Sequence, residues 1–262
     1  MNQMHHPDLV TTDLNEGLLT LTLGGGKAHA LSLAMIGAIH AALKAAADDA
    51  DVRVIMIHGP GPIFCAGHDL KEINRHSGDA DEGRAFLRDL FDACAEMMQA
   101  IAGSSKPVIA VVEGIATAAG CQMVASCHMA FAADGARFQL PGVNNGGFCT
   151  TPAVAVSRAV PRKHLMELLL SGDTFGTDWA MNAALINRVC PPDQVVAEAR
   201  AFAAGVAARN PGPIQSGIDT LNAHGGLGLE QAYGMARETM IGHFMDPRRR
   251  AIAAASKFAP KG

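Results

Sequence analysis

The chain has 262 residues, and its 21 basic and 25 acidic side chains give a formal net charge of −4. This balance argues against a strongly basic nucleic-acid-binding surface, and the 49% share of hydrophobic residues excludes a disordered chain. Only 5% of the residues are aromatic, which argues against a surface that stacks bases. We therefore predict a compact globular protein with no nucleic-acid or membrane partner.

Strands and helices are expected to alternate through the first half of the chain. The apolar residues of 18–23 alternate as in a half-buried strand. Residues 31–47 follow with the apolar spacing of a helix, and Ser32 is its expected N-cap. Residues 52–58 form a β-branched run that predicts a second strand. Further strands are expected at residues 108–112, 129–132 and 137–140, and helices at residues 86–101 and 120–126.

Helical patterns dominate from about residue 150 onward. The expected helices cover residues 152–160, 163–170, 178–184, 214–223, 229–244 and 248–258. An α/β front followed by a helical tail is the fold class that this order predicts. In such folds the loops after strand ends carry function, so the segments after residues 58 and 112 are where chemistry is expected.

The six cysteines include no C-x-x-C pair and no partner histidine at metal-ligand spacing. We therefore predict reduced thiols and no metal site. The chain also lacks a G-x-G-x-x-G run that opens a helix and a P-loop, so neither NAD nor ATP is implied and no cofactor is expected. The N-terminal stretch lacks the basic and apolar regions of a signal peptide, which predicts a cytoplasmic location.

Two loops rich in small residues, at 64–70 and 114–122, each precede a helix start. Backbone N–H groups at helix N-termini have no intrahelical acceptor and carry partial positive charge. One N–H group from each loop could converge on a single oxygen and form an oxyanion hole. The alternative is that the small residues only let helices pack against the sheet, and spacing alone favours neither interpretation.

Three motifs, in this order, carry a resemblance: F-C-A-G-H-D-L-K-E from Phe64, P-V-I-A-V-V-E-G-I-A-T-A-A-G-C-Q from Pro107, and R-A-V-P-R-K from Arg158. The pattern resembles the crotonase, or enoyl-CoA hydratase/isomerase, superfamily over nearly the whole chain. The resemblance implies a crotonase-type α/β spiral of ββα units over residues 1–200, which holds the acyl-CoA site. It also implies a helical oligomerisation segment over residues 201–262, a homotrimer or dimer of trimers, and acyl-CoA thioester substrates.

The resemblance assigns the backbone N–H groups of Ala66 and Ala119 to the oxyanion hole. The family usually has glycine at Ala118 and Ala119, and alanine can replace it as a backbone donor where φ is negative. The acyl-CoA site is expected to be lined by Lys27, Ala28, Ala30, Ala66, Gly67, His68, Asp69 and Leu70. Lys27, and also Lys71, could meet a CoA phosphate, although exposed lysines are commonplace.

Both glutamates that family hydratases use for proton transfer are replaced in this sequence. The matching positions hold Gln122 and Gly142. Adding water to a double bond needs a general base and a general acid, and neither residue has a titratable proton. The segments A-T-A-A-G-C-Q-M-V-A-S-C from Ala116 and P-G-V-N-N-G-G-F-C-T-T-P from Pro141 resemble the enoyl-CoA hydratase domain-containing protein 3 group. This resemblance implies that both replacements are shared by that group.

Other residues near these positions are candidates to replace the missing proton carriers. Cys149 could act as a nucleophile on a thioester, but a small buried thiol is the favoured interpretation. His68 could line the pocket, Asp69 is expected to be a helix N-cap, and Glu72 would complete a capping box. Three functions remain open: a nominal hydratase, a thioester hydrolase or other enolate enzyme, and a non-catalytic acyl-CoA-binding protein.

Overall fold

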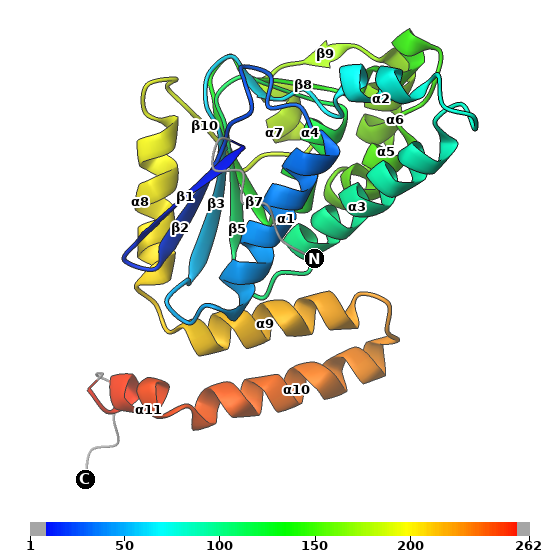
Figure 1. The fold of residues 1–262 in the computed structure, drawn as a ribbon. Helices are drawn as coiled ribbons and strands as arrows, with labels where there is room; N and C mark the ends of the chain where they lie inside the picture. Colours follow the sequence, from blue (N-terminus) through cyan, green and yellow to red (C-terminus); the bar gives the residue numbers. More distant parts are fainter. Residues whose placement is uncertain (1–8, 256–262) are drawn as a thin grey trace.

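Two sheets organise the part of the chain that the computed structural model describes, residues 9–255 (Figure 1). The six-stranded sheet has the order β1 (Val10–Asn15), β2 (Leu18–Leu23), β3 (Val54–Gly59), β5 (Val108–Val112), β7 (Met129–Ala133), β10 (Arg188–Cys190). The four-stranded sheet has the order β4 (Ile63–Cys65), β6 (Ile115–Thr117), β8 (Arg137–Gln139), β9 (Thr174–Phe175). Among the strands of residues 9–255, the β1–β2 and β8–β9 pairs are antiparallel and the other pairs are parallel.

The chain winds between the sheets as a spiral of ββα units. Strand β3 leads into β4, β5 into β6 and β7 into β8, so three successive strands of the large sheet each continue into a strand of the small one. The helices that follow or separate these pairs are α1 (Leu33–Asp48), α2 (Leu70–His76), α3 (Arg84–Ala102), α4 (Ala119–Ser126) and α5 (Thr150–Ala159). The predicted spiral fold is confirmed.

Each face of the large sheet packs against its own set of helices. Ile55 and Ile57 of β3 belong to the main core with α1, α3 and α4, whereas Val54 and Met56 pack against α8 (Val195–Ala207) on the other face. Successive strand side chains point to opposite faces, so a run that is apolar at every position is buried on both. This is why β3 and β5 lack the alternation of a half-exposed strand.

Helix α1 begins where the sequence predicts, because the Ser32 hydroxyl accepts a hydrogen bond from the N–H of Met35 at 3.1 Å. After α5 the chain forms two further helices and then α8. These two are α6 (Arg162–Ser171) and α7 (Thr177–Asn182). Helix α8 packs on the large sheet, so the core reaches Ala207 and the domain boundary predicted at residue 200 falls too early.

Three helices project from the core: α9 (Pro211–His224), α10 (Leu229–Met245) and α11 (Pro247–Ala254). None of them has a buried residue, and Figure 1 shows α10 and α11 separated from the sheets by α9. The helix expected at 248–258 ends at Ala254, and residues 256–258 lie outside the described part. No helix within residues 9–255 is both long and apolar enough to cross a membrane.

Candidate active site

The first loop follows β4 and pairs with a segment that lies far away in the sequence. The N–H of Ala66 donates to the carbonyl oxygen of Ala28 at 3.0 Å, and the N–H of Leu31 donates to that of Gly67 at 2.8 Å. The N–H of Asp69 then donates back to Leu31 at 3.1 Å. The expected acyl-CoA segments, residues 27–30 and 66–70, are therefore side by side.

This pairing corrects the donor assigned to the first loop. The N–H of Ala66 already has an acceptor in Ala28, so it is not free to hold a substrate oxygen. His68 and Leu31 form an isolated parallel bridge, and both of its hydrogen bonds are made by the neighbours of His68. The carbonyl oxygen of Gly67 accepts from the N–H of Leu31, and the N–H of Asp69 donates to the carbonyl oxygen of Leu31. The N–H of His68 consequently points away from Leu31 and has no acceptor among residues 9–255.

The second loop turns from β6 into α4 through a strained residue. Ala118 has φ +51°, a region that non-glycine residues rarely adopt, and its N–H donates to the carbonyl oxygen of Gln139 at 2.9 Å. Ala119 opens the helix with no positive φ, so its N–H, like others in a first helical turn, lacks an intrahelical acceptor. Within the described residues that N–H has no other acceptor.

Gly67 brings the two loops into contact. A Cβ atom at this position would lie 2.9 Å from the Cβ of Ala118 and 3.2 Å from the backbone nitrogen of Ala119. Gly67 also has φ +84°, which glycine adopts without steric cost. Backbone strain held by surrounding structure is common at functional sites, and here it occurs at Ala118, where the loops meet.

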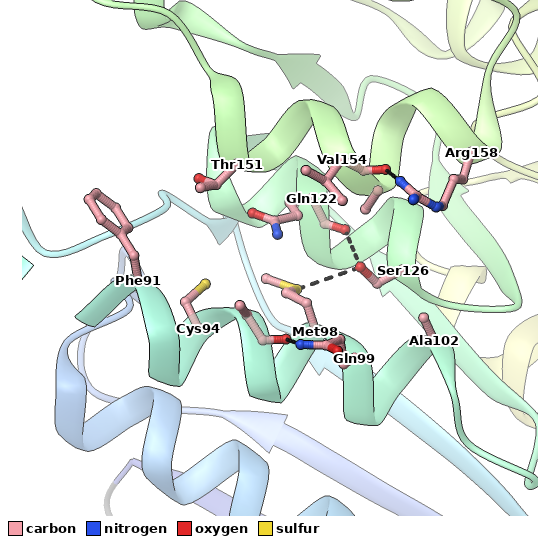
Figure 2. Close-up of a pocket in the computed structure, with 12 residues that line it drawn as sticks. Phe91, Cys94, Met98, Gln99, Ala102, Gln122, Ser126, Thr151, Val154 and Arg158 are labelled. Atoms are coloured by element: carbon pink, nitrogen blue, oxygen red, sulfur yellow. Dashed lines mark hydrogen bonds between the residues drawn. The ribbon is translucent and has the colours of Figure 1, made fainter. Parts of the chain in front are cut away.

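A groove of about 340 Å³ runs beside this contact, between α3, α4 and α5 (Figure 2). Its lining residues are Phe91, Cys94, Ala95, Met98, Gln99, Ala102, Gln122, Ser126, Thr151, Val154, Ala155 and Arg158. The His68 ring meets the ring of Phe91 edge to face at 5.2 Å, which links the first loop to the groove. The mostly apolar wall suits an acyl chain, and none of the lining residues is an aspartate or a glutamate.

Gln122 projects from α4 into this groove, whereas position 142 is closed to any side chain. Gly142 lies in a 3₁₀ helix (Pro141–Asn145), and a Cβ there would lie 2.5 Å from the nitrogen of Cys149 and 2.7 Å from the carbonyl carbon of Phe148. Those are backbone atoms, which cannot rotate aside. A glutamate at 142 therefore does not fit this backbone.

The Cys149 thiol is not prepared for nucleophilic attack. Burial raises its pKa, against a smaller opposing effect of the Gly142 N–H, which donates to Sγ at 3.2 Å. Burial likewise raises the pKa values of Cys65 and Cys121 to about 12. These thiols are protonated at neutral pH, whereas the thiolate is the nucleophilic form.

Burial lowers the pKa of His68, so its imidazole is neutral at neutral pH. Its Nε2 is buried and has no hydrogen-bond partner among residues 9–255. The structure also shows a residue that sequence reasoning missed, His29, with φ +43° and Nδ1 within 2.8 Å of the carbonyl oxygen of Ile63. Its position inside the expected acyl-CoA segment was the only available indication.

Asp69 is confirmed as the N-cap of α2, where its carboxylate accepts from the N–H groups of Lys71 and Glu72. The capping box predicted for Glu72 is wrong, because its carboxylate accepts from the N–H of Leu33 at 2.9 Å and so ties α2 to α1. Leu70, 65% exposed, and the exposed Lys27 and Lys71 lie at the surface next to the paired segments.

Comparison with known proteins identifies the class. The family model described as enoyl-CoA hydratase/isomerase matches residues 13–258, so the chain belongs to that family. A crystal structure of an enoyl-CoA hydratase/isomerase family protein from Silicibacter pomeroyi is 55% identical, with a TM-score of 0.87 over 91% of this chain and all of that one.

Within the family the chain is similar to the enoyl-CoA hydratase domain-containing protein 3 group, which confirms the predicted resemblance. The mitochondrial protein of that name from Rattus norvegicus is 38% identical over 236 residues, 90% of this chain and 77% of the relative. The crystal structure of the human protein is 33% identical, with a TM-score of 0.89 over 97% of this chain and 99% of that one.

The location predicted from the sequence is contradicted by the same comparison. Relatives from rat, mouse, frog and human that match between 86% and 92% of the chain are all named as mitochondrial proteins. The cytoplasmic prediction rested on the composition of the N-terminal stretch, and residues 1–8 lie outside the described part.

Among the described residues, no group of three or more His, Cys, Asp or Glu side chains could hold a metal ion.

Proposed function

We propose that this chain binds acyl-CoA thioesters and polarises the thioester carbonyl through the N–H groups of His68 and Ala119. The observation that carries the proposal is the contact at Gly67, which joins two loops that each have an N–H without an acceptor among residues 9–255. Preorganised N–H donors stabilise negative charge that develops on a carbonyl oxygen. The adjacent apolar groove supplies room for the acyl chain.

The nominal reaction of the family is hydration of a 2-enoyl-CoA to a 3-hydroxyacyl-CoA. It needs a group that takes a proton from water and a group that delivers one to carbon. The side chain of Gln122 does neither, position 142 has no side chain, and the groove has no carboxylate in its lining. The lack of proton carriers favours a second candidate over the hydratase, namely an acyl-CoA-binding protein that polarises its ligand without hydrating it.

Thioester hydrolysis through Cys149 has less support, because burial raises the pKa of this thiol. A Cys149→Ser variant that retains full turnover of any thioester would exclude the covalent route. Lys27 and Lys71, exposed beside the paired segments, are proposed to attract the CoA phosphates.

The donor pair is tested with cinnamoyl-CoA, whose conjugated thioester absorbs at longer wavelength when its carbonyl is polarised. We expect a red shift on binding to the wild type and its loss in Gly67→Ala, because the new Cβ would occupy the contact between the loops. Gly61→Ala is the matched control, since Gly61 also has a positive φ of +87° but a Cβ there meets nothing within 4 Å. Binding without a shift in the wild type contradicts the proposed donors.

Hydratase activity is tested by following the loss of crotonyl-CoA absorbance with the wild type and with Gln122→Glu. An inactive wild type and a variant that gains slow hydration would support a site that lacks only its proton carriers. Efficient hydration by the wild type would mean that an unrecognised group transfers the protons. It would refute the second candidate, a binding protein that does not hydrate its ligand.

The assembly is proposed to be a homotrimer or a dimer of trimers. The projecting helices expose large apolar side chains, including Leu229 at 76% and Tyr233 at 70%, which a monomer would leave in water. We expect sedimentation in multiples of three chains of 27.2 kDa, and smaller species for Leu229→Asp combined with Tyr233→Asp. A monomeric wild type would contradict this assembly.

A further inference from the structure

The amide of Gln122 occupies a defined place beside the two proposed donors. Gln122 follows Ala119 by three residues on α4, and positions three apart share one face of a helix. Helical side chains lean toward the N-terminus, so this amide lies over the turn that starts at Ala119. In Figure 2 it extends into the space between α3 and α5. A carbonyl oxygen held by the N–H of Ala119 would therefore place the first carbons of the acyl chain beside this amide.

The carbonyl oxygen of this amide is also unsatisfied. Gln122 is only 5% exposed, and its Oε1 is buried with no hydrogen-bond partner in the described part of the chain. The walls around it are largely apolar, including Cys94, Met98 and Val154. A buried polar group without a partner destabilises a folded protein, and an apolar residue would avoid that cost.

A second glutamine in the same groove shows the contrast. Gln99 of α3 is exposed, and its amide nitrogen donates to the carbonyl oxygen of Ala95 at 3.1 Å. Gln99 therefore has a partner within its own helix, whereas the buried Gln122 carbonyl has none among residues 9–255. Of these two glutamines, Gln122 is therefore the one whose carbonyl oxygen a ligand could satisfy.

We propose that Gln122 is a specificity-determining residue that hydrogen-bonds a hydroxyl group on carbon 2 or carbon 3 of the acyl chain. The inference rests on the proposed function and names its ligand class, a hydroxyacyl-CoA. A hydroxyl both donates and accepts, so it satisfies the amide whichever way the side chain is turned. A saturated acyl chain of the same length leaves the amide oxygen unpaired, and sites built to bond a hydroxyl discriminate against analogues that lack it.

The test measures the binding of butyryl-CoA, 2-hydroxybutyryl-CoA and 3-hydroxybutyryl-CoA by titration calorimetry. We expect the wild type to bind one hydroxylated thioester about tenfold more tightly than butyryl-CoA, which corresponds to about 1.4 kcal/mol. Gln122→Met should abolish this preference and bind butyryl-CoA at least as well as the wild type does. Gln99→Met, the matched control in the same groove, should keep the preference.

The outcomes separate this inference from the function on which it rests. Equal affinity of the wild type for all three thioesters overturns the role of Gln122 but leaves acyl-CoA binding in place. A preference that survives in Gln122→Met also overturns it. Failure of the wild type to bind any of the three overturns the proposed function itself. Thermal unfolding of Gln122→Met verifies folding, and we expect a melting temperature no lower than that of the wild type.

Discussion

Replacing Gly142 with alanine tests whether the backbone itself excludes any side chain at this position. The new Cβ would lie 2.5 Å from the nitrogen of Cys149 and 2.9 Å from the Cα of Phe148, so the 3₁₀ helix and the start of α5 must separate. That movement would also weaken the hydrogen bond from the Gly142 N–H to Sγ of Cys149, now 3.2 Å. We expect Gly142→Ala to destabilise the fold, and Gly142→Glu to destabilise it further.

Overpacking of this kind typically costs about 1–3 kcal/mol. For a domain of this size about 1 kcal/mol shifts the melting temperature by roughly 2–4 °C, so a cost near 2 kcal/mol predicts a decrease of about 4–8 °C for Gly142→Ala. The assay is thermal unfolding by circular dichroism at one fixed protein concentration, because oligomers melt at concentration-dependent temperatures.

The matched control is Gly37→Ala. Gly37 is an exposed position inside α1 where a Cβ meets nothing within 4 Å, so alanine should stabilise the helix by about 0.5–1 kcal/mol. If Gly142→Ala and Gly142→Glu melt within about 1 °C of the wild type while Gly37→Ala behaves as expected, steric exclusion at position 142 is refuted.

Three further predictions concern the thiols and the strained loop. Because the pKa values of Cys65 and Cys121 rise from 9.0 to about 12 on folding, iodoacetamide at pH 8 should leave both unmodified in the native protein, as peptide mass spectrometry would show. The same shift means that this contribution to stability is retained below pH 9 and falls as the pH rises toward 12, because in that range only the unfolded thiols release their protons. Equal urea midpoints at pH 8 and pH 10.5 would contradict this. Ala118→Gly should raise the free energy of unfolding by up to about 1 kcal/mol by relieving the positive φ, whereas Ala125→Gly, inside the helix that follows, should lower it by about 1 kcal/mol. Equal losses in both variants, measured in urea, would show that Ala118 is not strained.

The sequence by itself determined the long elements and the local caps. The strand predicted at 108–112 matches β5, and the side chains of Ser32 and Asp69 cap α1 and α2, because propensity and capping act within a few residues of the chain. The prediction that Gln122 and Gly142 stand at the positions of the family glutamates also came from the sequence alone.

The short strands were beyond sequence reasoning. Strands β4, β6 and β9 have three residues or fewer, too few for any periodicity to show. Their partners lie tens of residues away, so they exist only because the spiral brings them together.

Only the tertiary structure decided which backbone groups are free at the site. The N–H of Ala66 is taken by Ala28, 38 positions earlier in the chain, and this pairing leaves the N–H of His68 without an acceptor in the described part. The exclusion of a side chain at Gly142 likewise depends on the backbone around Cys149. Hydrogen bonds and steric contacts between distant segments follow from packing, and a local motif does not encode them.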